Sequence, residues 1–404
     1  MTAQLRELLD LFIRWVHLIA GIMWIGNSML FNWLDRNLEK PAGNSDPNYQ
    51  GKIWLLHSGA FYDVDKRLLR PNEMPAKLHW FKWQNFATWA TGISLLVIVY
   101  YFHGAAFLVD PSVRDVGPEI AIMLSISALF CGWLIYDALW RIVGETSPRF
   151  ATAVSIVFMF GSIYAFSQIF SGRAAYIETG VLIGTIMTGN VWFIIVPSQH
   201  ALVNATISGQ DQDPKLSIQA KARSIHNNYL TFPLIFIMVS NHFSAATTHP
   251  LNWLILIAVI VGGAGVRHFM NIRYLGGGKQ LALGAWLAPA IVMGAIATVG
   301  LVGISQLHPR PKFGIEGPVK FARAEEIIGT RCLRCHSQHP GDDVFKSAPN
   351  GVMFDTPEEI KTMATKIKYR VYDLANMPFN NKTHITDQER AELAAWVAGG
   401  AHIE

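Results

Sequence analysis

A short cysteine and histidine motif near the carboxyl end is the part of this sequence that most directly implies chemistry. Cys332 and Cys335 lie three residues apart, and His336 follows at once. This is the spacing of c-type haem attachment, in which two thiols bond to the haem vinyl groups and the adjacent imidazole coordinates iron. The motif predicts one covalent haem c, attached at both cysteines, with His336 as an axial ligand.

Two other kinds of site also use a Cys-x-x-Cys pair. A thioredoxin-like redox motif requires a βαβ context, which the sequence around the motif lacks. A zinc site requires two further ligands, and with only three cysteines in the chain there is no second cysteine pair. The haem interpretation is therefore favoured over both.

The second axial ligand is predicted to be a methionine. Met377 lies in an Asn-Met-Pro loop, and a loop methionine of this kind supplies a thioether to haem iron and raises its potential. Met353 and Met363 are the competitors, the first in a less defined loop and the second in a helical stretch. Met377 is preferred.

Helical patterns surround the motif. Residues 321–331 are predicted to form a helix leading into it, and the capping box of Thr386 and Glu389 opens a terminal helix. Leu393 and Trp396 lie on the apolar face of that helix. The segment resembles a small class I cytochrome c.

The amino-acid composition indicates to which class of protein the chain belongs. Of the 404 residues 51% are hydrophobic and only 15% are charged, against about 25% charged in ordinary soluble domains. This indicates a polytopic membrane protein and excludes disorder and a disulfide scaffold. The net charge of +4 is too small to suggest nucleic acid as a partner.

Eight segments are long and apolar enough to cross a bilayer. They are residues 15–34, 80–103, 120–143, 150–170, 174–202, two within 224–266, and 283–304. The predicted fold is therefore all-α, with an eight-span membrane domain over residues 1–304 and a cytochrome c domain over 320–404. A linker containing three prolines, residues 305–319, joins them.

Basic residues predict the orientation. Lys and Arg are concentrated in alternate loops, at 35–79, 141–149, 204–223 and 267–282, which should therefore be cytoplasmic. Eight spans then place the N-terminus and the cytochrome c domain in the periplasm of a bacterial inner membrane. Bacteria attach c-type haem in that compartment, so the motif and the topology agree.

Ionisable residues at membrane depth are functional candidates. Toward the periplasmic side lie His17, His103 and His242, which could bind a second haem, of b type, or a metal. Gly21 lies one turn from His17 and would let a flat macrocycle approach that helix. The alternative is a structural histidine held by hydrogen bonds.

A second group of candidates lies on the cytoplasmic side and could bind substrate or act in catalysis. It comprises His57, His79, His200, Arg267 and His268. Asp137 and Arg141 are four residues apart and should form a structural ion pair.

Three segments and the haem motif carry a family resemblance. The segments are residues 14–34, 55–71 and 78–92. With the tail motif, they resemble the membrane-bound urate oxidase (urate hydroxylase, PuuD-type) family of bacterial purine catabolism. The resemblance implies oxidation of urate to 5-hydroxyisourate, with electrons passing to the haem rather than directly to oxygen. A downstream cytochrome c or a terminal oxidase would then accept them.

Urate is a flat anion, suited to an arginine clamp, an aromatic stack and a histidine base. The cytoplasmic candidates would supply these parts, but electrons would then have to cross much of the bilayer. Either another redox centre bridges the gap or the substrate site opens outward. The alternative functions are a quinol–cytochrome c oxidoreductase and a membrane-anchored cytochrome c electron carrier.

Overall fold

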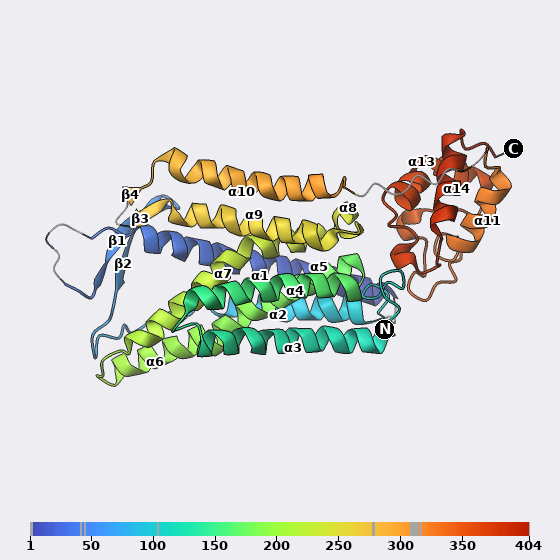
Figure 1. Cartoon of the computed structure of the whole chain (residues 1–404). Coiled ribbons are helices and arrows are strands. Elements are labelled where there is room, and N and C mark those ends of the chain that lie inside the picture. Colours follow the sequence, from blue (N-terminus) through green and yellow to red (C-terminus); the bar gives the residue numbers. More distant parts are fainter. Residues whose placement is uncertain are drawn as a thin grey trace.

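The protein is described by a computed structural model covering residues 3–40, 43, 46–102, 105–276, 279–307, 315 and 317–403. Long helices run side by side in an elongated bundle, and a smaller helical tail lies at one end of it (Figure 1). The beginning of the chain lies at the same end as the tail (Figure 1). The tail and the amino-terminal end of the first helix therefore share one face of the bundle.

The bundle consists of long helices, two of them extended by π-helical turns. They are α1 (Ala3–Asn37), α2 (Trp83–Leu95) with η1 (Leu96–Tyr101), α3 (Pro118–Ile142), α4 (Pro148–Ile169), α5 (Gly172–Gly189) with η2 (Asn190–Ile195) and α6 (Val196–Ile207), α7 (Pro214–Ser240), the short α8 (Ser244–Thr247), α9 (Asn252–Ile272) and α10 (Leu283–Ile304). Helix α5 packs against α3, α4 and α7 and forms much of the core.

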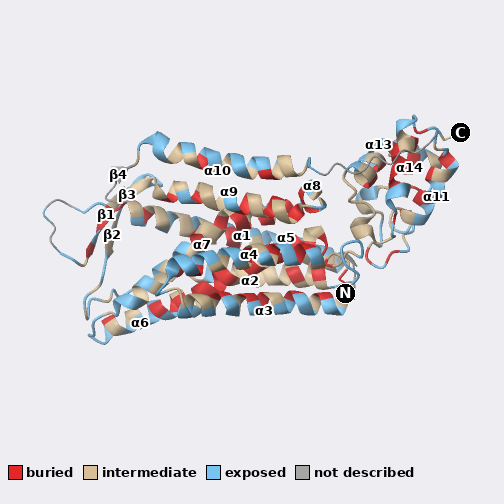
Figure 2. Ribbon diagram, viewed as in Figure 1, coloured by how far each residue is buried: buried red, intermediate tan, exposed pale blue. Residues whose placement is uncertain are grey.

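Burial differs sharply between the central and the outer helices. In the α5–α6 segment 67% of the most apolar window is buried, against 11% in α1 and in α10. Buried residues gather along the interior of the bundle, and α10 presents mostly exposed and half-buried residues (Figure 2). Because the exposed residues of α1 and α10 are largely apolar, these helices suit contact with lipid.

Six of the described helices are long and apolar enough to cross a membrane. They are Leu5–Asn37, Pro118–Ile142, Pro148–Ile169, Gly172–Ile207, Asn252–Ile272 and Leu283–Ile304. The sequence predicts two further spans, which fall on α2–η1 and α7. Helix α2 has only 13 residues before the π-helical turn, and α7 carries the buried polar residues Arg223, Asn227 and Asn228.

Two small antiparallel hairpins interrupt the helical pattern at the end of the bundle opposite the tail (Figure 1). The larger pairs β1 (Tyr49–His57) with β2 (Ala60–Arg67), and the smaller pairs β3 (Tyr274–Gly276) with β4 (Lys279–Gln280). Ser58 and Gly59 form the turn of the larger hairpin, both with positive φ, as a tight two-residue connection requires.

The tail builds its own hydrophobic core from short helices. These are α11 (Phe321–Arg331), η3 (Pro349–Gly351), α12 (Pro357–Thr362), α13 (Ala364–Ile367), η4 (Lys368–Asp373), η5 (Phe379–Asn381) and α14 (Asp387–Ala398). Leu393 and Trp396 of α14 pack with Ile327 and Ile328 of α11. The predicted helix before the motif and the capping box that opens α14 are both confirmed.

Candidate functional site

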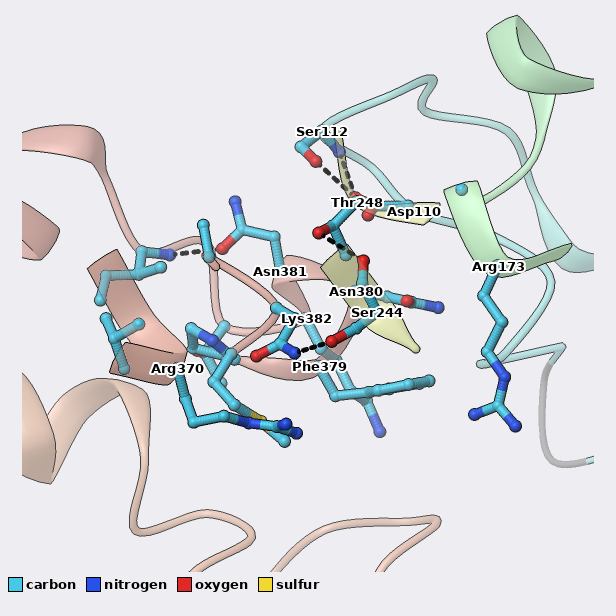
Figure 3. A pocket seen from close by; sticks show the side chains of 18 of the residues that line it. Asp110, Ser112, Arg173, Ser244, Thr248, Arg370, Phe379, Asn380, Asn381 and Lys382 are labelled. Carbon is cyan, nitrogen blue, oxygen red and sulfur yellow. Dashed lines mark hydrogen bonds between the residues drawn. The ribbon is translucent and has the colours of Figure 1, made fainter. Parts of the chain in front are cut away.

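A cavity of about 700 Å³ lies where the tail meets the bundle. Its tail side includes Cys332, Cys335, His336 and Met377. Its bundle side is formed by the loop after η1, the start of α5 and the segment from the end of α7 through α8. Figure 3 shows residues of both sides facing one space. The volume lies within the usual range for small-molecule and cofactor sites.

The end of α11 determines the geometry of the motif. Cys332 is the C-cap residue of this helix, and the backbone N–H groups of Cys335 and His336 donate to the Cys332 carbonyl at 3.1 and 2.9 Å. One turn thus presents both thiols and the imidazole to the cavity. His336 Nδ1 lies 2.9 Å from the carbonyl of Val352, a contact that fits Nδ1–H as donor and leaves Nε2 for a metal.

Burial keeps the motif in its uncharged form. It raises the pKa of Cys332 to about 12 and that of Cys335 to about 11, and it lowers the pKa of His336. A redox-active thiol pair has the opposite property, a lowered pKa that maintains a reactive thiolate. A neutral imidazole beside two protonated thiols suits a haem attachment site.

Met363 and Met377 both line the cavity. The Met377 loop is held by a buried arginine, because Arg390 Nη1 donates to the carbonyls of Met377 and Val371 at 2.5 and 2.6 Å. Two thiols, an imidazole nitrogen and a thioether therefore face a common space, and this donor set fits a c-type haem.

The Met377 loop, residues 374–380, also touches the bundle. Asn380 Nδ2 donates to the carbonyls of Ala106 and Val109 at 2.8 and 3.1 Å. Further hydrogen bonds join Asn376 to Ser244, and Thr248 to the carbonyl of Leu374. The predicted distal ligand thus lies between contacts that fasten the tail to the bundle.

An aromatic contact closes the same interface. The rings of Phe107, from the bundle, and Phe379, from the tail, have centroids 4.6 Å apart, and Phe345 lies 6.3 Å from Phe107. The guanidinium of Arg173, at the start of α5, lies 5.8 Å above the Phe107 ring. A continuous series of contacts therefore runs from α5 to the Met377 loop.

The histidines predicted on the periplasmic side do not share one environment in the structure. His242 follows α7 and lines the cavity. His17 instead faces α2, where its Nδ1 lies 2.9 Å from both the carbonyl of Thr88 and the hydroxyl of Thr91. His103 lies outside the described residues. His17 thus has the hydrogen-bonded environment of a structural histidine, which a haem-ligating histidine also uses.

The five candidates at the opposite end make separate contacts. His57 is exposed beside the hairpin turn, 2.7 Å from the hydroxyl of Ser58. His200 stacks on Trp80 at 4.3 Å, and His79, the residue before Trp80, meets Phe81 edge-on.

Arg267 and His268 are adjacent on α9 but face different partners. Arg267 is buried and donates to Asn228 at 3.0 Å, whereas His268 Nδ1 lies 2.8 Å from the Tyr229 hydroxyl. In the described part of the chain, these contacts form separate sites rather than one clamp.

A network of buried polar side chains lies deeper in the bundle. The sequence predicted one part of it, the pair of Asp137 and Arg141. The predicted pair of Asp137 and Arg141 is confirmed at 2.6 Å, and Asp137 also pairs with the buried Arg223 at 2.9 Å. Arg223 donates in turn to Asn190, whose amide reaches the Tyr136 hydroxyl. The sequence signal that could have indicated the rest of this network is the presence of charged and amide side chains within otherwise apolar helices.

Comparison with known families identifies the bundle. A model described as urate oxidase N-terminal matches residues 3–300, which is most of the chain and extends from α1 into α10. The chain belongs to the urate oxidase N-terminal family. Membership supports a urate-related oxidase role and suggests an oxidoreductase. No curated protein and no solved structure matches the chain at a significant level.

The family match ends before the haem motif begins. The tail, with Cys332, Cys335 and His336, therefore lies beyond the matched residues.

Proposed function

We propose that the protein is a membrane-bound oxidoreductase that converts urate to 5-hydroxyisourate and passes the electrons to a c-type haem in its tail. The observation that carries the proposal is the cavity described above, because residues of the urate oxidase bundle and the Cys332–His336 motif line the same space. A substrate oxidised by the bundle would then lie close to its electron acceptor.

The reaction balances without a peroxide product. Urate and one water molecule give 5-hydroxyisourate, two protons and two electrons, and a carbon–oxygen bond to the water oxygen forms. A c-type haem bound here would accept single electrons, so an external one-electron carrier must reoxidise it twice for each urate. A soluble cytochrome c or a terminal oxidase is the proposed acceptor.

Four residues of the tail would hold the haem. Cys332 and Cys335 would attach the haem covalently, and His336 and Met377 would supply the ligands to its iron. The contact between Asn380 and the bundle would keep the Met377 loop against the membrane domain.

The proposed topology follows from the family and from the charge pattern. We propose that α2–η1 and α7 cross the bilayer with the six apolar helices, giving eight spans in a bacterial inner membrane. The linker and the cytochrome c domain would lie in the periplasm. A competing proposal admits urate at the opposite end through the set His57, His79, His200, Arg267 and His268. That route requires a second redox centre, such as a haem b at His17 or His242.

The test follows urate with an acceptor in the absence of oxygen. Purified protein is mixed with urate and an oxidised one-electron carrier, and loss of urate is measured against reduction of the carrier. We expect two carrier molecules to be reduced for each urate, and the variant C332A/C335A to lose this activity. Consumption of urate only in the presence of oxygen, with peroxide formed, would contradict the proposal. Haem reduction by a quinol but not by urate would favour the quinol oxidoreductase instead.

A further inference from the structure

The bundle side of the junction cavity contains an arginine without a carboxylate partner. Arg173 lines the cavity, and its Nε donates to the amide oxygen of Asn241 at 2.9 Å. Among the described residues it forms no ion pair. The acidic residue on this side, Asp110, instead accepts hydrogen bonds from the backbone and hydroxyl of Ser112. Among the described residues Arg173 therefore has an amide and a phenol as polar partners, but no carboxylate that would neutralise its charge.

The start of α5 adds to the positive potential at this point. Arg173 lies in the first turn of a long helix, where the helix dipole is positive, and that turn contains no acidic residue. Ser171 caps only the N–H of Ala174. A cation in this position is locally unfavourable, so a bound anion would stabilise both the side chain and the helix end.

Flat aromatic surfaces and amides lie beside the guanidinium. Phe107 is in contact with Arg173, and Phe379 packs against Phe107 from the tail. The Asn241 amide oxygen also accepts from the Tyr100 hydroxyl at 3.3 Å, which fixes its orientation. In Figure 3 Arg173 reaches from the start of α5 toward the space that Phe379 enters from the tail. These groups can recognise a planar anion through charge, hydrogen bonds and ring contact.

We propose that the urate anion binds on the bundle side of the junction cavity, against Arg173 and beside Phe107, next to the haem motif. This inference rests on the proposed function and names the site at which that function occurs. Urate would enter from the face that carries the tail, and its electrons would reach the motif without crossing the bilayer.

A second group of cationic side chains lies at the opposite end of the bundle. It is the other place in the described chain where an anion such as urate would find positive charge, so the proposal chooses between two sites. Arg36, Arg267 and Arg273 lie close enough for their charges to repel, and among the described residues none pairs with a carboxylate. Urate bound there would be separated from the tail by the length of the bundle (Figure 1). Electron transfer weakens steeply with distance, so the site beside the motif is the favoured one.

The test compares urate kinetics in four variants of the full-length protein. Removal of a charge-assisted hydrogen bond in R173Q should raise the KM for urate about 10- to 100-fold. R173K keeps the charge but not the forked geometry, so its KM should fall between those of the wild type and R173Q. R114Q, at an exposed arginine outside the cavity lining, is the matched control and should leave KM unchanged. R267Q tests the opposite end of the bundle, where the competing urate site would lie.

Three further measurements separate the possible roles of Arg173. Haem content and the dithionite-reduced spectrum report whether each variant has folded, and the haem reduction potential reports contact with the cofactor. A shifted potential with an unchanged KM in R173Q would assign Arg173 to a haem propionate and overturn the proposal. A raised KM in R267Q instead of R173Q would place urate at the opposite end. If the wild type itself does not couple urate to haem reduction, the proposed function fails, independently of the site.

Discussion

Replacing Asn380 with glycine removes the side-chain amide that joins the tail to the loop after η1. The position has φ of 46°, in the left-handed region, so glycine keeps the backbone conformation without strain. The variant N380G therefore deletes two interface hydrogen bonds and leaves the fold of the tail intact. Alanine would add a backbone penalty and confuse the two effects.

The magnitude follows from the contacts. Asn380 donates at 2.8 and 3.1 Å to two backbone carbonyls, and a hydrogen bond of this kind contributes about 0.5–1.5 kcal/mol net. Docking of the tail should weaken by about 1–3 kcal/mol. This corresponds to an increase of about 5- to 150-fold in the fraction of undocked molecules.

Hydrogen–deuterium exchange on the full-length protein measures this fraction directly. Peptides covering residues 105–109 and 374–380 should exchange faster in N380G by the same factor, whereas peptides from the tail core should not. N72G is the control, because Asn72 also has positive φ but is exposed and lies outside this interface. Unchanged exchange in both segments would show that Asn380 does not hold the tail, and the docking account would be wrong.

Three further substitutions test the structure around the site and in the tail. G172A places a methyl group in collision with the carbonyl of Thr247 and should cost about 1–3 kcal/mol, whereas G184A on the same helix meets open space and should be neutral or stabilising in a thermal inactivation assay. Equal effects of the two would refute the close contact between α5 and α8. In the tail, burial opposes ionisation of Asp342, but hydrogen bonds from Lys382 and the backbone outweigh it and lower its pKa to about 2. Its contribution to stability is therefore complete above its ordinary pKa of 3.8 and is lost as the pH falls toward 2. D342N should lower the free energy of unfolding of the tail by about 2 kcal/mol at pH 7 and remove this acid dependence, as followed by denaturant titration at several pH values. An unchanged acid profile would contradict the assigned ion pair.

Local signals in the sequence predicted the parts of the structure that depend on neighbouring residues. The Cys332–His336 motif, the helix before it and the capping box at Thr386 all act within one or two turns, and the structure contains each helix where it was expected. The pair of Asp137 and Arg141 is of the same kind.

Other elements depended on contacts that the sequence does not display. The β1–β2 hairpin was overlooked, although its alternating residues around Ser58 and Gly59 were a usable signal. The sequence predicted eight membrane spans, whereas six helices of the described chain are clearly long and apolar enough to cross a membrane. One of the two others, α7, buries polar side chains against other helices instead of presenting an apolar surface.

The junction cavity also escaped sequence analysis. Arg173, Phe107 and Asn380 are far apart in the chain and meet only when the tail docks on the bundle. The cytoplasmic candidates were grouped by predicted topology alone, and side-chain contacts divide them among several neighbours.

The central claim is that urate reduces the haem within this chain. The most direct measurement is anaerobic stopped-flow mixing of the oxidised protein with urate, while the haem c absorption band is monitored. The account predicts rapid reduction, with two haems reduced for each urate consumed. If the haem stays oxidised while urate disappears, or if urate is left untouched, the bundle and the tail do not form one electron-transfer unit.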